Sequence, residues 1–204
     1  MKKSIMINGQ PFWYDAVDLN FAEGEAITHD QAKEILFKMK DLLDEKGIKF
    51  WLMYGTLLGA VRDKDFIPYD FDVDIQTKDV DKLENSIPWF DQQGVKLIRA
   101  EQGRLYSFTI DSVYIDVYIA KDAPFPLNIW CSWLNGFIVP TKLIYPLSEL
   151  DFLGKRFLIP GNSEKLMEFF YGKTWKTPIP GAHGRYDIYP VYFYRRYIKK
   201  WLGR

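Results

Sequence analysis

Two aspartates near residue 73 are the residues of this chain best suited to chemistry. Asp72 and Asp74 stand two positions apart in the segment YDFDVDI, and a further acid, Asp70, precedes them. Side chains at i and i+2 of an extended strand point to the same face, so this pair is predicted to lie close together. Two neighbouring carboxylates repel each other unless one keeps its proton or a cation lies between them. Carboxylate oxygens are hard ligands that suit Mg²⁺ or Mn²⁺, so we predict such a metal site here.

The residues between these acids are apolar. Phe71, Val73 and Ile75 alternate with the aspartates. This pattern predicts a strand with one buried apolar face and one polar face. A lone Asp-x-Asp pair is more often a solvated strand edge or turn, and the alternation is what favours a metal site over that interpretation.

A glycine-bracketed segment, Gly55 to Gly59, precedes the acids. We expect a short helix over 56–62, whose N-terminal backbone N–H groups form a seat for phosphate. The two glycines allow close approach of the backbone to phosphate, Thr56 adds a hydroxyl, and Arg62 adds a positive charge. Together with a metal-binding pair, these are the components that phosphoryl transfer requires.

The stretch 47–75, GIKFWLMYGTLLGAVRDKDFIPYDFDVDI, resembles the signature of the LicD/fukutin family. The family pattern runs roughly G-T-L-L-G-x-x-R and later I-P-W-D-x-D-x-D. This chain matches it at Gly55, Thr56, Leu57, Leu58, Gly59, Arg62, Ile67, Pro68, Asp70, Asp72 and Asp74. It departs at Tyr69, where Trp is usual, and at Phe71, where a further Asp is common. A second, weaker likeness to Y-G-x-x-W-x-x-P falls at Tyr171, Gly172, Trp175 and Pro178.

The resemblance implies an α+β fold with a nucleotidyltransferase-like mixed sheet flanked by helices. It also implies transfer of a phosphoalcohol from a CDP-activated donor, such as CDP-choline, CDP-ribitol or CDP-glycerol, to the hydroxyl of a glycan or lipid-linked glycan. In that reaction Asp72 and Asp74 would hold one or two Mg²⁺ or Mn²⁺ ions on the donor diphosphate. The Gly55–Gly59 segment and Arg62 would bind its phosphates, and Tyr171 and Trp175 would shape the cleft or simply pack.

A third acid, Asp116, lies in another predicted strand, VYIDVYIA over 113–120. An aspartate among apolar neighbours is costly to bury unless it is paired or binds metal. Nucleotidyltransferase-like sites take their third carboxylate from such a neighbouring strand. We therefore expect Asp116 to complete the metal site or to accept the proton of the acceptor hydroxyl. The alternative is a surface aspartate on a half-exposed strand.

The rest of the pattern predicts one domain over 1–204, with an N-terminal arm over 1–27 and an aromatic, basic tail over 189–204. Helices are expected over 28–47, opened by a Thr28–Gln31 capping box, and over 79–93, where Pro88 threatens a break. A further helix is expected after an Asn162 cap, and an Asn8-Gly9 turn suggests a hairpin in the arm. Strands are expected over 48–54, 72–76, 95–100, 105–110 and 113–120.

Composition limits the classes of function. The 204 residues carry no net charge, which argues against nonspecific nucleic-acid binding. A single cysteine, Cys131, allows no disulfide within the chain and no cysteine-rich zinc site. No apolar run follows the basic N-terminus or reaches the ~20 residues of a membrane span. We therefore expect a cytoplasmic protein, with peripheral contact at the inner membrane face through the tail as an open alternative to packing on the core.

Other functions remain open at this point. The same three carboxylates also serve nucleotidyl transfer, which would move AMP or UMP to a small molecule or protein. A non-catalytic accessory subunit of glycan assembly is the alternative from another class, although three clustered acids argue against it. His183 lies in the loop GAHGRYD, from which it would reach the site or remain solvated.

Overall fold

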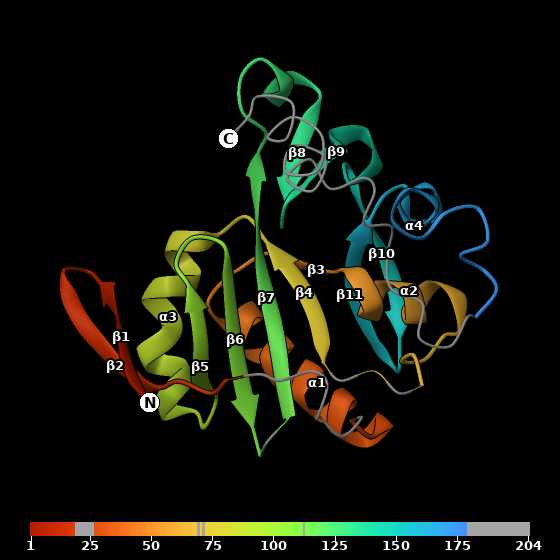
Figure 1. The fold of residues 1–204 in the computed structure, drawn as a ribbon. Coiled ribbons are helices and arrows are strands. Elements are labelled where there is room, and N and C mark those ends of the chain that lie inside the picture. The colour runs from red at the N-terminus through yellow and green to blue at the C-terminus, as the bar shows by residue number, and fades with distance from the viewer. Residues whose placement is uncertain (19–26, 69, 71, 112, 179–204) are drawn as a thin grey trace, which may run out of the picture.

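A mixed β-sheet forms the centre of the molecule (Figure 1). The computed structural model describes residues 1–18, 27–68, 70, 72–111 and 113–178. The strand order is β3-β4-β7-β6-β5. The strands are β3 (Phe50–Leu52), β4 (Val73–Thr77), β5 (Lys96–Glu101), β6 (Leu105–Ile110) and β7 (Val113–Asp122). The five strands predicted for this region are confirmed, with small shifts at their ends.

Strands β4 and β7 are neighbours and run parallel, whereas the other pairs of this sheet are antiparallel. Their register places Asp74 beside Asp116 and Ile75 beside Val117. Because side chains alternate along each strand, both aspartates lie on one face and both apolar residues lie on the other. The sheet therefore has an apolar face and a face that carries acids.

Helices α1 (His29–Glu45) and α3 (Val80–Gln92) pack behind the strands in the view of Figure 1. Thr28 and Gln31 form the predicted capping box at the start of α1. Pro88 lies inside α3 without ending it, because Leu83, Ile87 and Phe90 of the helix are buried on the sheet. These two helices bury the apolar face and leave the acidic face to other elements.

The remaining elements surround the acidic face and the sheet ends. Helix α2 (Tyr54–Arg62) follows β3 directly, and α4 (Ser163–Tyr171) packs near it. Asn162 precedes α4 as predicted, but its side chain makes no capping hydrogen bond. Three hairpins complete the described chain: β1 (Lys2–Ile7) with β2 (Gln10–Asp15), β8 (Cys131–Leu134) with β9 (Phe137–Pro140), and β10 (Leu147–Phe152) with β11 (Lys155–Pro160).

The hairpin β8–β9 continues the sheet through the end of β7, where Ala120 pairs with Leu134. Two short 3-10 turns, η1 (Leu127–Ile129) and η2 (Thr141–Leu143), flank this hairpin. Within the described residues, no helix combines the length and apolar character needed to cross a bilayer. His183 and the tail over 189–204 lie outside the described residues, as do Tyr69 and Phe71.

Gly59 sets how closely the chain can pack on α2. A Cβ atom at this position would lie 2.4 Å from the carbonyl oxygen of Asp65 and 3.1 Å from the backbone nitrogen of Ile67. The segment that leads from α2 back to the acids therefore rests directly on the helix. Only a residue without a side chain allows this contact.

We predict that Gly59→Ala destabilises the protein. Alanine at an unhindered helical position would stabilise it by about 1 kcal/mol. Here the backbone of Asp65 must move, so we expect the free energy of unfolding to fall by about 1–3 kcal/mol in chemical denaturation. Gly55→Ala is the comparison, because its Cβ would meet side chains rather than backbone: Oδ2 of Asp70 at 2.7 Å, which can move, and Oδ2 of Asp74 at 3.5 Å, an ordinary contact. A Gly59→Ala variant as stable as the wild type would contradict this account.

Candidate active site

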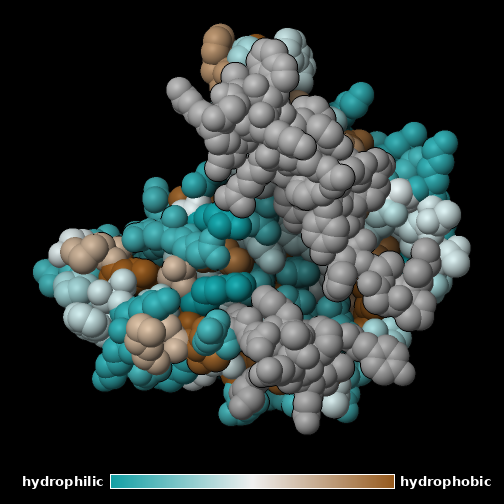
Figure 2. Space-filling view, viewed as in Figure 1, coloured by the Kyte–Doolittle hydropathy of each residue, from teal (hydrophilic) through white to brown (hydrophobic). Residues whose placement is uncertain are grey.

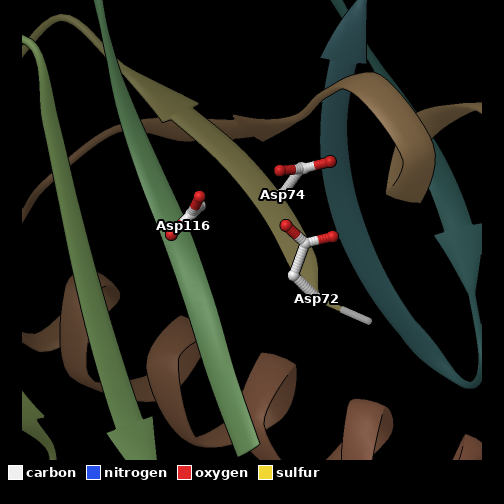
Figure 3. A group of neighbouring side chains, drawn as sticks. All are labelled: Asp72, Asp74 and Asp116. Carbon is white, nitrogen blue, oxygen red and sulfur yellow. The ribbon is translucent and has the colours of Figure 1, made fainter. Parts of the chain in front are cut away.

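Asp72, Asp74 and Asp116 converge on one point of the acidic face (Figure 3). One oxygen from each carboxylate lies within 4.8 Å of the oxygens offered by the other two. Asp74 comes from β4, Asp116 from β7, and Asp72 directly precedes β4. Strand β4 begins one residue later than predicted, so Asp72 lies just before its first residue. The three acids still come together.

Burial makes this cluster electrostatically costly. The Asp116 side chain is 1% exposed, and Asp74 is also buried. Burial, with the negative charges of Asp116 and Asp70, raises the pKa of Asp72 to about 7. Burial and the neighbouring charge of Asp72 raise the pKa of Asp74 well above its ordinary value. In the absence of a cation, the cluster therefore favours retained protons.

The chemistry of the cluster fits a divalent cation. Among the described residues, Oδ1 of Asp74 is buried and has no hydrogen-bond partner. A buried carboxylate oxygen without a donor is costly, and a metal ion would satisfy it. Three carboxylates without histidine or cysteine form a hard oxygen set, which suits Mg²⁺ or Mn²⁺.

Asp116 is held by a network that the sequence analysis missed. Arg99 on β5 donates from Nη2 to Oδ2 of Asp116 at 2.7 Å and from Nε to Ser107 at 2.9 Å. Ser107 on β6 donates to Oδ1 of Asp116 at 2.5 Å, and the Tyr118 hydroxyl donates to Oδ2 at 3.3 Å. Burial raises the pKa of Asp116, while the Arg99 charge and these bonds oppose that rise.

A β-bulge delivers Arg99 to this network. Leu97 pairs with Phe108, but the next pair is Arg99 with Ser107, so Ile98 is an extra residue. If the strand had no bulge, regular pairing would place Ile98 opposite Ser107. The Arg99 side chain would then lie on the other face of the sheet, away from Asp116. The adjacent apolar residues Leu97 and Ile98 break the alternation, and this was the available sequence signal.

The predicted phosphate-binding residues lie along α2. This helix begins at Tyr54, two residues earlier than expected, so Gly55 and Thr56 belong to its first turn. The Gly55 N–H donates to Oδ2 of Asp74 at 3.2 Å, and the Asp74 N–H donates to the Thr56 hydroxyl at 2.8 Å. The structure therefore brings the helix start against the acids. Phosphate binding there stays a prediction.

Arg62 lies at the other end of α2, about 10 Å along the axis from Gly55 at 1.5 Å per residue. Its guanidinium donates to both carboxylate oxygens of Asp63, at 2.8 and 2.7 Å, and to the Trp175 carbonyl at 3.5 Å. In this structure Arg62 joins α2 to the segment after α4. Among the described residues, the cationic side chain that bonds to one of the three acids is Arg99, through Asp116.

A cleft of about 180 Å³ opens beside the acids. Asp72 and Asp74 line it together with one amide and five aromatic rings: Asn135, Tyr54, Tyr118, Phe137, Phe170 and Tyr171. Two roles were open for Tyr171 and Trp175: shaping the cleft or packing alone. Tyr171 lines the cleft, whereas the Trp175 ring is buried. In Figure 2, which shows the same face as Figure 1, hydrophilic residues predominate in the visible part of the centre.

Comparison with known proteins gives a family match. A family model described as "LicD/FKTN/FKRP, nucleotidyltransferase domain" matches residues 47–162. The chain is 29% identical over 180 residues to the human ribitol-5-phosphate transferase FKTN, covering 82% of this chain. It is 27% identical over 143 residues to the human ribitol 5-phosphate transferase FKRP, covering 64% of this chain. It spans only 38% of the length of the first and 29% of the second.

A similar solved structure is the lincosamide antibiotic adenylyltransferase LnuA with lincomycin bound. It shares 14% sequence identity at a TM-score of 0.49, covering 69% of this chain and 85% of that one. A structure of ANT(2")-Ia in complex with adenylyl-2"-tobramycin has a TM-score of 0.48 at 14% identity, covering 67% of this chain and 73% of that one.

We predict that metal-free protein becomes less stable as the pH rises from 5 to 8. The pKa of Asp72 is about 7 in the folded protein against an ordinary 3.8, so the folded state binds more protons in this window. We expect the wild type to lose about 2 kcal/mol relative to Asp72→Asn, or roughly 4–8 °C in Tm. Thermal unfolding in chelator across this range measures it, and saturating Mg²⁺ should remove the difference. Equal pH profiles for the two proteins would contradict the prediction.

A second prediction concerns the Arg99–Asp116 pair. Arg99→Gln leaves a buried carboxylate without its cation, so we expect a loss of about 2–4 kcal/mol in unfolding free energy at pH 8. The control is Arg156→Gln, because the Arg156–Glu149 pair is 67% and 60% exposed and should contribute less than about 0.5 kcal/mol. Similar losses for the two variants would show that Arg99 is an ordinary surface residue.

Proposed function

This chain belongs to the LicD/FKTN/FKRP family, and from that premise we propose that it is a metal-dependent transferase that moves a phosphoalcohol from a CDP-activated donor to a glycan hydroxyl. The names of the FKTN and FKRP relatives favour ribitol phosphate as the transferred group, with phosphocholine and glycerol phosphate as the other candidates. The family resemblance seen in residues 47–75 is confirmed by the family match.

The observation that carries this proposal is the cluster of Asp72, Asp74 and Asp116, with one oxygen of each within 4.8 Å of the others. Such a cluster has no evident structural benefit, because burial and mutual repulsion both oppose ionisation. Cation binding removes that cost and supports phosphoryl chemistry at the same place. A purely structural role would be better served by apolar residues of similar size.

In the proposed reaction, the acceptor oxygen forms a bond to the phosphorus that carries the alcohol. The bond from that phosphorus to the bridging oxygen breaks, and CMP leaves with the bridging oxygen. A bound Mg²⁺ or Mn²⁺ would neutralise charge that develops on the phosphates. Nucleotidyl transfer differs in that the nucleoside phosphorus is attacked, and it remains the second reaction to test.

The protein's own groups have distinct tasks in this proposal. Asp72 and Asp74 hold the cation, and the Gly55 N–H orients the Asp74 carboxylate through Oδ2. Asp116 completes the site or accepts the proton of the acceptor hydroxyl. Arg99 holds Asp116 in place and opposes the rise of its pKa, since the guanidinium donates hydrogen bonds to both Asp116 and Ser107. Arg62 would bind phosphate only after leaving Asp63.

The acceptor is proposed to be a glycan or a lipid-linked glycan, as the family resemblance implies. Peripheral membrane contact through the tail over 189–204 remains a proposal of the same kind. The basic and aromatic residues of that segment support it.

We predict that one CDP-alcohol stabilises the protein in the presence of Mg²⁺. A ligand at 100 times its Kd stabilises the folded state by about 2.7 kcal/mol, which corresponds to a rise in Tm of roughly 5–10 °C. The measurement is thermal unfolding with CDP-ribitol, CDP-choline, CDP-glycerol, CTP, ATP and UTP. Asp72→Asn and Asp74→Asn should abolish the shift, because they remove cation ligands.

Each result separates the candidate functions. A Mg²⁺-dependent shift with a CDP-alcohol, followed by CMP release in the presence of an acceptor, supports phosphoalcohol transfer. A shift with ATP or UTP alone would move the assignment to nucleotidyl transfer. No shift with any nucleotide, in protein that also fails to bind Mg²⁺, would favour a non-catalytic accessory subunit.

A further inference from the structure

The cleft beside the acids has a lining of two chemical kinds. Asp72 and Asp74 line one part of it, and aromatic rings line much of the rest. These rings pack tightly: Tyr54 and Tyr118 lie 4.8 Å apart edge to face, and Phe137 and Phe170 lie 4.9 Å apart. Its volume of about 180 Å³ is below the roughly 300–1,000 Å³ that holds a drug-sized ligand. The cleft is therefore matched to one ring-sized part of a donor.

A single amide, that of Asn135, interrupts the aromatic lining. Asn135 and Gly136 form the tight turn of the β8–β9 hairpin, with φ values of 42° and 95°. Asn-Gly is the preferred sequence for a two-residue turn of this kind. The turn geometry thus explains why asparagine occurs at position 135, but it does not explain the orientation of its side-chain amide.

Arg104 fixes the orientation of this amide. Its Nε and Nη2 both donate to Oδ1 of Asn135, at 3.2 and 3.0 Å, and Glu101 accepts a bond from Nη1 of the same guanidinium. An oxygen must face these two donors, so the amide NH₂ group points elsewhere. Within the described part of the chain this NH₂ group has no hydrogen-bond acceptor, and the residue that carries it lines the cleft.

We propose that the cleft is the subsite for the pyrimidine base of the donor, and that Asn135 is the residue that determines base specificity. The base would stack on the rings, while the Asn135 NH₂ group donates to a carbonyl oxygen or ring nitrogen of the base. The diphosphate would then lie toward Asp72 and Asp74. This inference rests on the proposed function, because it assumes a nucleotide-activated donor.

The alcohol part of the donor fits the same cleft less well. A polyol has no flat face that could stack on the rings of the cleft. A quaternary ammonium suits aromatic rings, but it would meet the positive end of the fixed Asn135 amide and would compete with the cation held by Asp72 and Asp74. A planar base uses both the rings and the amide donor.

The test compares CDP with pyrophosphate, which lacks the nucleoside. Both are titrated calorimetrically with Mg²⁺ into wild type, Asn135→Asp and Asn135→Gly. Aspartate keeps the turn and the pairing with Arg104 but replaces the donor by an acceptor, and glycine removes the side chain without strain. The matched control is Asn8→Asp, at the Asn8-Gly9 turn of the β1–β2 hairpin, where φ is 49° and 75°.

We expect CDP to bind the wild type at least tenfold more tightly than pyrophosphate. Asn135→Asp should weaken CDP by roughly 10- to 100-fold and leave pyrophosphate within twofold. Asn135→Gly should weaken CDP to a smaller extent, and Asn8→Asp should change neither.

If Asn135→Asp leaves CDP binding unchanged, the proposed base subsite is overturned, whereas the proposed function is not. Weakened binding of phosphocholine or ribitol 5-phosphate in that variant, with CDP unchanged, would overturn the base subsite too and assign the cleft to the alcohol. Failure of both CDP and pyrophosphate to bind wild type with Mg²⁺ would overturn the proposed function together with this inference.

Discussion

The confinement of three carboxylates to one small, mostly buried volume is the constraint on which the rest of this structure depends. Parallel pairing of β4 and β7 places Asp74 and Asp116 side by side, and Asp72 enters from the residue before β4. Such a group is unstable by itself, because desolvation and repulsion both oppose its negative charge. The fold must therefore hold these strands with free energy from elsewhere. It does so on the opposite face, where Val73, Ile75, Ile115 and Val117 are fully buried and where α1 packs against β4 and β7.

Polar contacts on the acidic face then fix each carboxylate individually. Asp74 accepts a hydrogen bond from the Gly55 N–H at the start of α2. Asp116 accepts hydrogen bonds from Arg99, Ser107 and Tyr118. One oxygen of Asp74 is left without a donor among the described residues. A network that satisfied every oxygen would stabilise the apoprotein, and it would leave no open position for a cation. The incomplete satisfaction of this cluster is therefore the feature that links its structure to chemistry.

Local patterns were sufficient to predict much of this arrangement. Alternation in 70–75 and 113–120 identified both acid-bearing strands, and the capping box at Thr28 identified the start of α1. Arg99 was not predicted as a site residue. A single extra residue in β5, Ile98, reverses the face on which the Arg99 side chain lies, and strict alternation cannot reveal this. Arg62 was predicted at the phosphates from its motif position, and this stays a prediction; the helix places it nearly two turns from Gly55, paired with Asp63. Asn135 was readable as a turn residue from the Asn-Gly pair, whereas its contact with Arg104 depends on tertiary structure.

The residues that line the cleft come from different parts of the fold. The acids belong to the central sheet, whose strands are held on both sides by hydrogen bonds and beneath by helices. The rings and the amide come largely from added elements: Asn135 and Phe137 from the β8–β9 hairpin, and Phe170 and Tyr171 from α4. The family match ends at residue 162, before α4 begins. The match therefore covers the three acids and the β8–β9 hairpin that carries Asn135 and Phe137, but it does not cover the two rings of α4. In our proposal the choice of donor depends on side chains of the hairpin and of α4, where a substitution can change the shape of the cleft without moving the carboxylates.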